Sequence, residues 1–181
     1  MPNSVQLKRI SMKKILFPTV ISLILFASCT RSVYVVRHAE KIAATDSLAK
    51  MMANDLPLSE AGKVRAIVLK EQLSGNHIKY IYSTNTSRTK NTADPLSKAI
   101  NIPVNIYNNI DSLVSIIKSR KGNVLVVGHS NTVDDIVNKL TGETKIAADL
   151  KDYEYDNIFI VNMRGKKKFF RQRKYGYPSN P

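Results

Sequence analysis

The stretches Val33-Tyr34-Val35-Val36-Arg37-His38 and Val124-Leu125-Val126-Val127-Gly128-His129 decide the fold of this 181-residue chain. Each is a short β-branched run that stops at polar residues, which is typical of a buried strand in a parallel sheet. In an open α/β sheet, ligands bind in the crevice beyond the carboxyl ends of the strands. Because both runs end in a histidine, we expect His38 and His129 to face one ligand.

Further short apolar runs alternate with segments of helical spacing. Strands are expected at 32–36, 80–83, 104–107 and 123–127, and helices at 59–73, 87–100, 111–119 and 132–140, with Ser59 and Asp111 as N-caps. Near the C-terminus, the runs 158–161 and 168–171 flank a turn and predict a β-hairpin, followed by a frayed tail over 175–181. This order is typical of a three-layer α/β/α domain with a mainly parallel central sheet.

The composition is that of one globular domain with a large positive charge. Hydrophobic residues make up 43% of the chain and charged residues 23%, which excludes a disordered protein. The length suits one substantial core and is too short for two ordinary domains. The formal net charge of +14 suits anionic substrates, an anionic membrane surface or solubility alone.

Residues 1–28 predict a secretory signal, because basic residues precede an apolar stretch at 15–26 that is short for a membrane span. Leu25-Phe26-Ala27-Ser28-Cys29 resembles a bacterial lipobox, in which the cysteine becomes the acylated mature N-terminus. Cys29 is the only cysteine, so no intrachain disulfide is possible. We expect residues 29–181 to form an exported domain anchored at Cys29 to a membrane of the bacterial cell envelope. An ordinary cleaved signal is the alternative. Met12-Lys13-Lys14-Ile15 resembles the usual beginning of such a signal, so the start of translation, Met1 or Met12, stays open.

Three polar segments follow predicted strands: Arg37-His38-Ala39-Glu40-Lys41, the segment 83–93 that contains Arg88, and Gly128-His129-Ser130-Asn131-Thr132. Together they would bring two arginines, two histidines and two helix N-termini to one crevice. Arginine forks and helix-terminal N–H groups neutralise a phosphoryl group well. A neutral imidazole can attack phosphorus to form a phosphohistidine, and a second imidazole can stabilise the charge that develops on oxygen.

In this order the three segments resemble the histidine phosphatase superfamily, the group that includes phosphoglycerate mutases and small phosphohistidine phosphatases. The resemblance covers residues 33–141. It implies a phosphatase in which His38 is the nucleophile, while Arg37, Arg88, His129 and Ser130 complete the phosphate pocket. The residues that carry it are Arg37-His38 with Ala39 in place of the family's glycine, Leu58-Ser59-Glu60-Ala61-Gly62, Ser87-Arg88-Thr89 with Thr92-Ala93, and Gly128-His129-Ser130.

Many members of this family use a glutamate between the second and third motifs as the general acid. Between Thr92 and Gly128 this chain has only Asp94 and Asp111 as carboxylates. We favour Asp111 as the acid, with a purely capping role as its alternative. Glu40, beside the nucleophile, is the second candidate, and a salt bridge is its alternative role. An imidazole leaving group, as in a protein phosphohistidine, depends less on an acid.

The leading hypothesis is therefore a metal-independent and cofactor-free phosphatase that acts on small phosphorylated substrates or phosphoproteins. A lipoprotein that binds phosphate without turnover is the alternative, since no clear acid is present. A mutase fits less well, because the chain is short and carries an export signal. A metal site is disfavoured because the neighbouring arginines would repel a cation. We interpret the basic run 164–174 as a solvated hairpin that protects a sheet edge, with anionic lipid as a possible contact, and expect no nucleic-acid partner.

Overall fold

The computed structural model describes residues 30–43 and 55–179, in which strands and helices alternate as far as residue 141. The predicted elements are confirmed to within about two residues at each end, except that both hairpin strands extend three residues further than predicted. In chain order they are β1 (Arg31–Arg37), α2 (Glu60–Leu73), the 3-10 turn η1 (Ser74–Asn76), β2 (Ile78–Ser83), α3 (Ser87–Ile100), β3 (Val104–Ile106), α4 (Ile110–Ser119), β4 (Asn123–Gly128), α5 (Val133–Thr141), β5 (Asn157–Arg164) and β6 (Lys167–Lys174).

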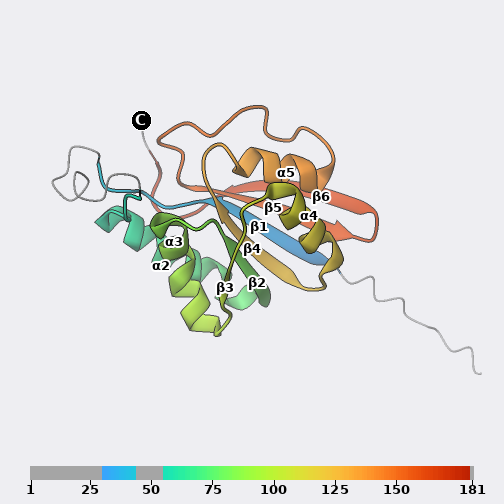
Figure 1. The fold of residues 1–181 in the computed structure, drawn as a ribbon, viewed down its shortest axis with the longest axis horizontal. Helices are drawn as coiled ribbons and strands as arrows, with labels where there is room; N and C mark the ends of the chain where they lie inside the picture. The colour runs from blue at the N-terminus through green and yellow to red at the C-terminus, as the bar shows by residue number, and fades with distance from the viewer. Residues whose placement is uncertain (1–29, 44–54, 180–181) are drawn as a thin grey trace, which may run out of the picture.

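The described strands form one six-stranded sheet in the order β3-β2-β4-β1-β5-β6 (Figure 1). Strands β1 to β4 are parallel to one another, whereas β5 is antiparallel to β1, and β6 is antiparallel to β5. The mainly parallel sheet and the C-terminal hairpin are thus confirmed. The two β-branched runs are its central pair, in register from Val33 opposite Val124 to Arg37 opposite Gly128.

Helices cover both faces of the sheet, as the three-layer prediction requires. Helices α2 and α3 pack on one face through Leu69, Leu73 and Leu96, and α4 and α5 pack on the other through Ile117 and Ile136. Burying each such aliphatic side chain stabilises the fold by about 1.5–3 kcal/mol. The buried hydrophobic residues of the described chain all lie between residues 33 and 175. A chain that starts at Thr30 therefore keeps this whole core and is expected to fold alone.

The start of α2 holds the loop that follows β1. Ser59 caps the helix as predicted, since its Oγ accepts from the Gly62 main-chain N–H at 3.2 Å. The Ser59 N–H donates to the Glu40 carbonyl at 2.9 Å. A Cβ atom at Gly62 would lie 2.1 Å from that same carbonyl oxygen. Glycine is therefore required here for α2 to pack against the loop that carries His38.

Two predictions about local structure are wrong. Asp111 does not cap α4: Asn109 does, through a 2.9 Å hydrogen bond from the Ser112 N–H, and Asp111 lies in the first turn. The helix begins one residue earlier than expected, which shifts the cap to another good capping residue.

The tail over 175–181 is not frayed at its beginning. Tyr175 is 3% exposed and packs into the core on the α2 side. Its N–H donates to the Asp156 carbonyl at 2.9 Å, and its carbonyl accepts from Arg65 Nη1 at 2.8 Å. Burial of one aromatic ring by α2 therefore fixes a segment that lacks any periodic pattern.

The predicted signal at 1–28 and the predicted anchor at Cys29 lie outside the described residues. So does most of the 42–57 loop. Within residues 30–43 and 55–179, no helix is both long and apolar enough to cross a membrane.

Candidate active site

The two histidines meet at the carboxyl ends of the central strands. His38 directly follows β1 and His129 directly follows β4, and their ring centroids are 5.4 Å apart with the ring planes at 66°. The His38 main-chain N–H donates to the Gly128 carbonyl at 2.9 Å, which extends the ladder between the two strands to the site itself. The His129 N–H donates to Thr132 Oγ1 at 2.8 Å, which fixes the turn into α5. The predicted convergence of the histidines is thus seen in the structure.

His38 is held as a neutral imidazole with one defined tautomer. Its Nδ1 lies 2.8 Å from the Ala39 carbonyl oxygen, and because a carbonyl can only accept, Nδ1 carries the proton. Nε2 therefore keeps its lone pair. Burial is the main reason that the pKa of His38 falls to about 3, and the charges of Arg37 and Arg88 lower it further. At neutral pH the unprotonated Nε2 is available as a nucleophile.

His129 has the opposite tautomer. Arg88 Nη2 lies 3.4 Å from its Nδ1, and a guanidinium can only donate, so Nδ1 accepts. Nε2 then carries the proton and donates to Thr84 Oγ1 at 2.9 Å. Burial, followed by the charges of Arg88 and Arg37, lowers the pKa of His129 to about 4. His129 is therefore an N–H donor at the site without being cationic.

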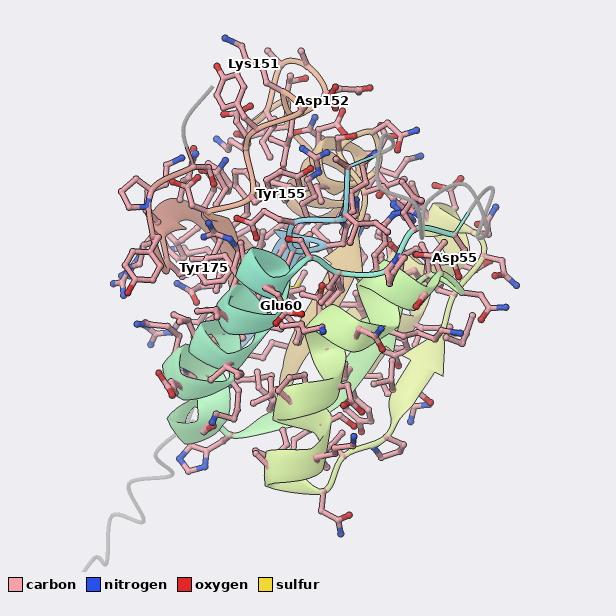
Figure 2. All side chains as sticks on the ribbon, turned by 90° about the vertical axis from the view of Figure 1, so that its left-hand side faces the viewer. Asp55, Glu60, Lys151, Asp152, Tyr155 and Tyr175 are labelled. Carbon is pink, nitrogen blue, oxygen red and sulfur yellow. The ribbon has the colours of Figure 1, made fainter. Side chains whose placement is uncertain are left out.

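Arg37 is buried against the segment that leads into β5. Its side chain is 3% exposed, and Nη1 donates to the Lys151 carbonyl at 2.7 Å. Its guanidinium lies over the ring of Tyr155, 4.3 Å from the ring centroid, and the same ring lies 5.9 Å from that of His38. Figure 2, which looks onto the carboxyl end of the sheet, shows Tyr155 below the turn of Lys151 and Asp152. Tyr155 was not predicted, because it follows no strand and belongs to no motif.

Arg88 is held by a residue that sequence reasoning also missed. Asp55 Oδ1 lies 3.6 Å from Arg88 Nη1, and both Asp55 oxygens accept from the Ser87 N–H at 2.8 Å. Asp55 thus caps α3 from a distant segment, while the side chain of Thr86 at the N-cap position makes no capping hydrogen bond to a main-chain N–H. Figure 2 shows Asp55 on the same end of the molecule as Tyr155. A single acidic residue in an irregular segment carries no signal of this role.

Arg37 and Arg88 each have an N–H group without a hydrogen-bond acceptor in the described part of the chain. In both residues this group is the Nε–H, and it is buried. A buried donor without a partner is costly, and more so when it is charged. A phosphoryl group beside His38 would supply acceptors to both. No three His, Cys, Asp or Glu side chains gather into a metal-binding group within residues 30–43 and 55–179.

Two further predicted positions adjoin this group. Ser130 follows His129 in the same turn, and its carbonyl accepts from the Leu150 N–H at 3.0 Å. Ala39, which stands where the family has glycine, is fully buried, and its N–H donates to Thr92 Oγ1 at 2.9 Å. Ala39 is not among the residues with positive φ. The loop therefore does not need the conformational freedom of glycine at this position.

The two predicted acids have other partners. Both oxygens of Glu40 accept from Arg65 Nε at 2.9 Å, and Oε1 also accepts from Arg65 Nη2 at 2.7 Å. Asp111 is exposed and pairs with Lys139 Nζ at 2.6 Å, in the last turn of α5 and so at the end of that helix away from His129. The structure thus brings Arg37, His38, Arg88 and His129 together but does not add Asp111 to them, and it turns the Glu40 carboxylate towards α2.

Comparisons with known proteins bear on the superfamily and on the fold. The sequence model of the histidine phosphatase superfamily (branch 1) matches residues 33–113, which supports that superfamily. No curated protein matches the chain.

Several solved structures share the fold. The SixA protein of Agrobacterium tumefaciens is 20% identical, with a TM-score of 0.59 over 81% of this chain and 98% of its own. The protein histidine phosphatase SixA complexed with tungstate is 19% identical, with a TM-score of 0.59 over 79% of this chain and 96% of its own. A mutant phosphoserine phosphatase from Entamoeba histolytica in complex with phosphoserine is 13% identical, with a TM-score of 0.55 over 77% and 94%. At these identities the likeness establishes the fold alone.

Proposed function

We propose that this chain is a metal-independent phosphatase of the histidine phosphatase superfamily that works through a phosphohistidine on His38. One observation carries the proposal: a neutral imidazole with its Nε2 lone pair free lies beside two arginines whose buried Nε–H groups lack acceptors. The match of residues 33–113 to the superfamily supports it. Arginine supplies the positive charge that a metal ion supplies in many other phosphoryl transfers.

The reaction has two steps. In the first, the Nε2 lone pair of His38 forms a bond to phosphorus as the bond to the leaving atom breaks, and that atom departs with the electron pair. In the second, water attacks phosphorus, the N–P bond breaks, and inorganic phosphate leaves with His38 neutral again. Arg37 and Arg88 hold the phosphoryl oxygens throughout, and the Nε2–H of His129 can turn from Thr84 to the oxygens as their charge changes.

The surroundings of the carboxylates favour a substrate with an undemanding leaving group. Glu40 is bound to Arg65, and Asp111 pairs with Lys139. An alkoxide leaving group needs a proton from a nearby acid, whereas the imidazole of a phosphohistidine needs less help. We therefore place phosphohistidine, in a phosphoprotein or a small molecule, before phosphomonoesters. One protein of the same fold is named a protein histidine phosphatase.

The predicted signal and lipobox add a location to this proposal. Cleavage before Cys29 and acylation of its thiol would leave the domain on the outer side of a bacterial membrane. Detection of an acylated N-terminal peptide by mass spectrometry, and its loss in Cys29→Ser, tests this part separately from catalysis.

The experiment for catalysis uses the chain from Thr30 with an aryl phosphate and with phosphohistidine, in the presence of EDTA. We expect turnover by the wild type and a phosphoenzyme that can be trapped after brief exposure to radiolabelled substrate. His38→Ala should lose both. His77→Asn is the matched control, because His77 is an exposed histidine in a left-handed conformation that asparagine tolerates. Equal turnover by His38→Ala would refute the proposal.

A second candidate is a phosphate-binding protein without turnover, and the engagement of both predicted acids by basic residues favours it. Binding of phosphate or vanadate measured by calorimetry, without hydrolysis of either substrate, would establish this function instead.

A further inference from the structure

The amino end of the sheet is strongly basic and is not used by the proposed reaction. Three segments meet there, at 74–79, 118–123 and 163–168, and they contain eight Lys or Arg residues and no Asp or Glu. We call them the basic end. Arg120, Lys121, Arg164, Lys166 and Lys167 are all exposed, and none of them forms an ion pair within the part of the chain that the structure describes.

The topology explains why these segments meet. Because β1, β2 and β4 are parallel, the segments that enter β2 and β4 lie at the end where β1 begins. The antiparallel β5 finishes at this same end, with Met163 opposite Arg31. The Arg31 guanidinium donates to the main-chain oxygens of Arg120 and Lys118, which joins the 118–123 segment to the start of β1.

The basic end surrounds the point at which the chain enters the domain. Thr30 is exposed and β1 begins at Arg31, so only Thr30 lies between Arg31 and the predicted anchor at Cys29. Two extended steps along the chain span about 7 Å. An acyl chain on Cys29 would therefore hold this end of the domain, and not a distant one, against the bilayer. Figure 1 shows the start of β1 and the β5–β6 turn on the same side of the molecule, opposite the ends of β1 and β4 that carry the histidines.

An exposed aromatic side chain adds to the charge. Phe169 lies on β6 two residues beyond Lys167 and is 51% exposed. Cations on flexible stems together with an exposed aromatic ring are the side chains that bind an anionic membrane interface. Within the described residues the five cations named above make no side-chain ion pairs, so their charge remains available to a broad anionic surface.

We propose that the basic end binds the anionic phospholipid surface of the membrane that holds Cys29, and so turns the active site away from the bilayer. This inference rests on the proposed anchoring but not on catalysis. The β1 strand from Arg31 to Arg37 spans about 20 Å, so the histidines would lie at least that far above the headgroups. Phosphorylated substrates could then reach them from the aqueous side while the anchor stays in place.

The test is co-sedimentation of the chain from Thr30, which lacks any lipid, with vesicles of phosphatidylcholine with and without phosphatidylglycerol. We expect binding to the anionic vesicles and at least tenfold weaker binding to the neutral ones. Lys166→Gln/Lys167→Gln and Lys118→Gln/Lys121→Gln should each weaken binding roughly tenfold, since each removes two cations near the surface. Hydrolysis of a soluble aryl phosphate should not change in either variant.

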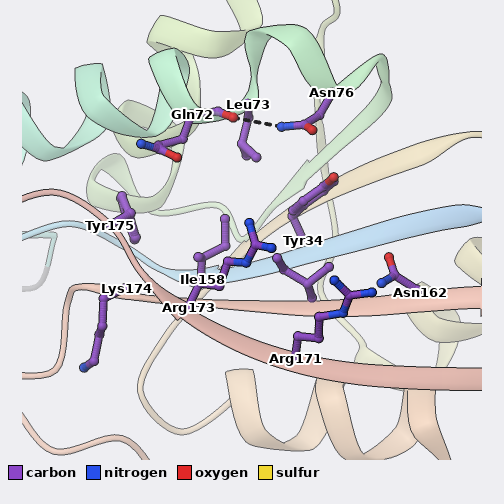
Figure 3. A pocket seen from close by; sticks show the side chains of 11 residues that line it. Tyr34, Gln72, Leu73, Asn76, Ile158, Asn162, Arg171, Arg173, Lys174 and Tyr175 are labelled. Atoms are coloured by element: carbon purple, nitrogen blue, oxygen red, sulfur yellow. Dashed lines mark hydrogen bonds between the residues drawn. The ribbon is translucent and has the colours of Figure 1, made fainter.

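The matched control removes the same charge elsewhere. Arg171 and Arg173 line a groove beside Tyr34, Gln72 and Asn76, part of the way along the sheet (Figure 3). Arg171 is four residues along β6 from Lys167, about 13 Å, which exceeds the screening length of about 8 Å at physiological salt. Arg171→Gln/Arg173→Gln should therefore weaken vesicle binding by less than about threefold.

Three outcomes would overturn the inference. They are equal binding to neutral and anionic vesicles, no binding to either, and an equal loss in the Arg171/Arg173 control. Retention by an acidic protein or a nucleic acid, with no binding to anionic vesicles, would assign the basic end to another class of partner. Because turnover of a soluble substrate is measured on the same samples, a failure of vesicle binding is distinct from a failure of the proposed phosphatase activity.

Discussion

The two ends of the sheet both carry cationic side chains, but they hold them in different ways. At the carboxyl end, Arg37 is buried, and its guanidinium is fixed by the Lys151 carbonyl and the ring of Tyr155. At the amino end, Lys166 and Lys167 are exposed and without ion pairs in the described residues. Charges in a water-poor site act strongly on one ligand, whereas exposed charges act together and are screened by salt. The first arrangement suits chemistry on one phosphoryl group, and the second suits a broad anionic surface.

Removal of one fixed arginine should have the largest effect. Arg37→Gln is expected to lower kcat/KM for an aryl phosphate by about 10²–10³-fold, the usual loss when one charge-stabilising donor is removed from an active site. Arg171→Gln, at an exposed position of the same charge, should change it by less than twofold. Because Arg37 is buried, Arg88→Gln serves as a second variant if Arg37→Gln fails to fold. Equal values of kcat/KM for the Arg37 and Arg171 variants would mean that a fixed, buried cation contributes no more to turnover than an exposed one.

Acid should destabilise the carboxyl end. The folded state holds the pKa of His38 at about 3 and that of His129 at about 4, below the ordinary value of 6.5, chiefly through burial. Between these values and 6.5 the unfolded chain binds more protons than the folded chain, so stability rises with pH across this window. The free energy of unfolding in urea should fall by several kcal/mol from neutral pH to the lower end of the window, because each pKa unit corresponds to about 1.4 kcal/mol.

Replacement of the buried imidazole tests the cause of this pH dependence. His38→Gln should reduce the fall in stability, whereas His77→Asn should leave it unchanged, because His77 is exposed. A wild-type stability that stays constant over the window would mean that the histidines are not held neutral by the fold.

Asp55 links the helix cap to the arginine, and two substitutions separate these roles. Asp55→Ala removes the acceptor for the Ser87 N–H and should lower the free energy of unfolding by about 1 kcal/mol. Asp55→Asn keeps an acceptor but removes the charge beside Arg88. It should lower the free energy of unfolding by a few tenths of a kcal/mol or less, because Asp55 is half-exposed and such ion pairs contribute little. Urea unfolding measures both, and equal losses would mean that the charge, not the cap, matters.

Sequence reasoning found the parts of the site that lie on the strand ends. His38 and His129 end β-branched runs, and Arg88 belongs to the segment that follows another strand. Because strands alternate with helices along the chain, these strands are expected to be parallel and to bring the three residues to one edge of the sheet. Asp55 and Tyr155 come from irregular segments with no period, and only the packed fold shows that they reach Arg88 and Arg37.

The two local errors have similar physical causes. Asn109 and Asp111 are both good capping residues, two positions apart, and the boundary of a helix is decided by packing as well as by the cap. Tyr175 looked like part of a polar tail, but its ring completes the core and its carbonyl accepts from Arg65. A contact between residues 110 positions apart in the chain cannot be predicted from the local sequence around either residue.

Raising the salt concentration should weaken vesicle binding by the amino end while changing turnover at the carboxyl end very little. The cations at the amino end are exposed, so raising the ionic strength from about 0.1 M to 1 M, which shortens the screening length from about 10 Å to 3 Å, should abolish binding to anionic vesicles. Arg37 is 3% exposed, and its contact with a bound phosphoryl group would be largely shielded from that screening. We therefore expect kcat for a soluble aryl phosphate to change by less than about twofold over the same range. A parallel loss of vesicle binding and kcat would mean that the carboxyl end is as open to solvent as the amino end, and that burial does not distinguish them.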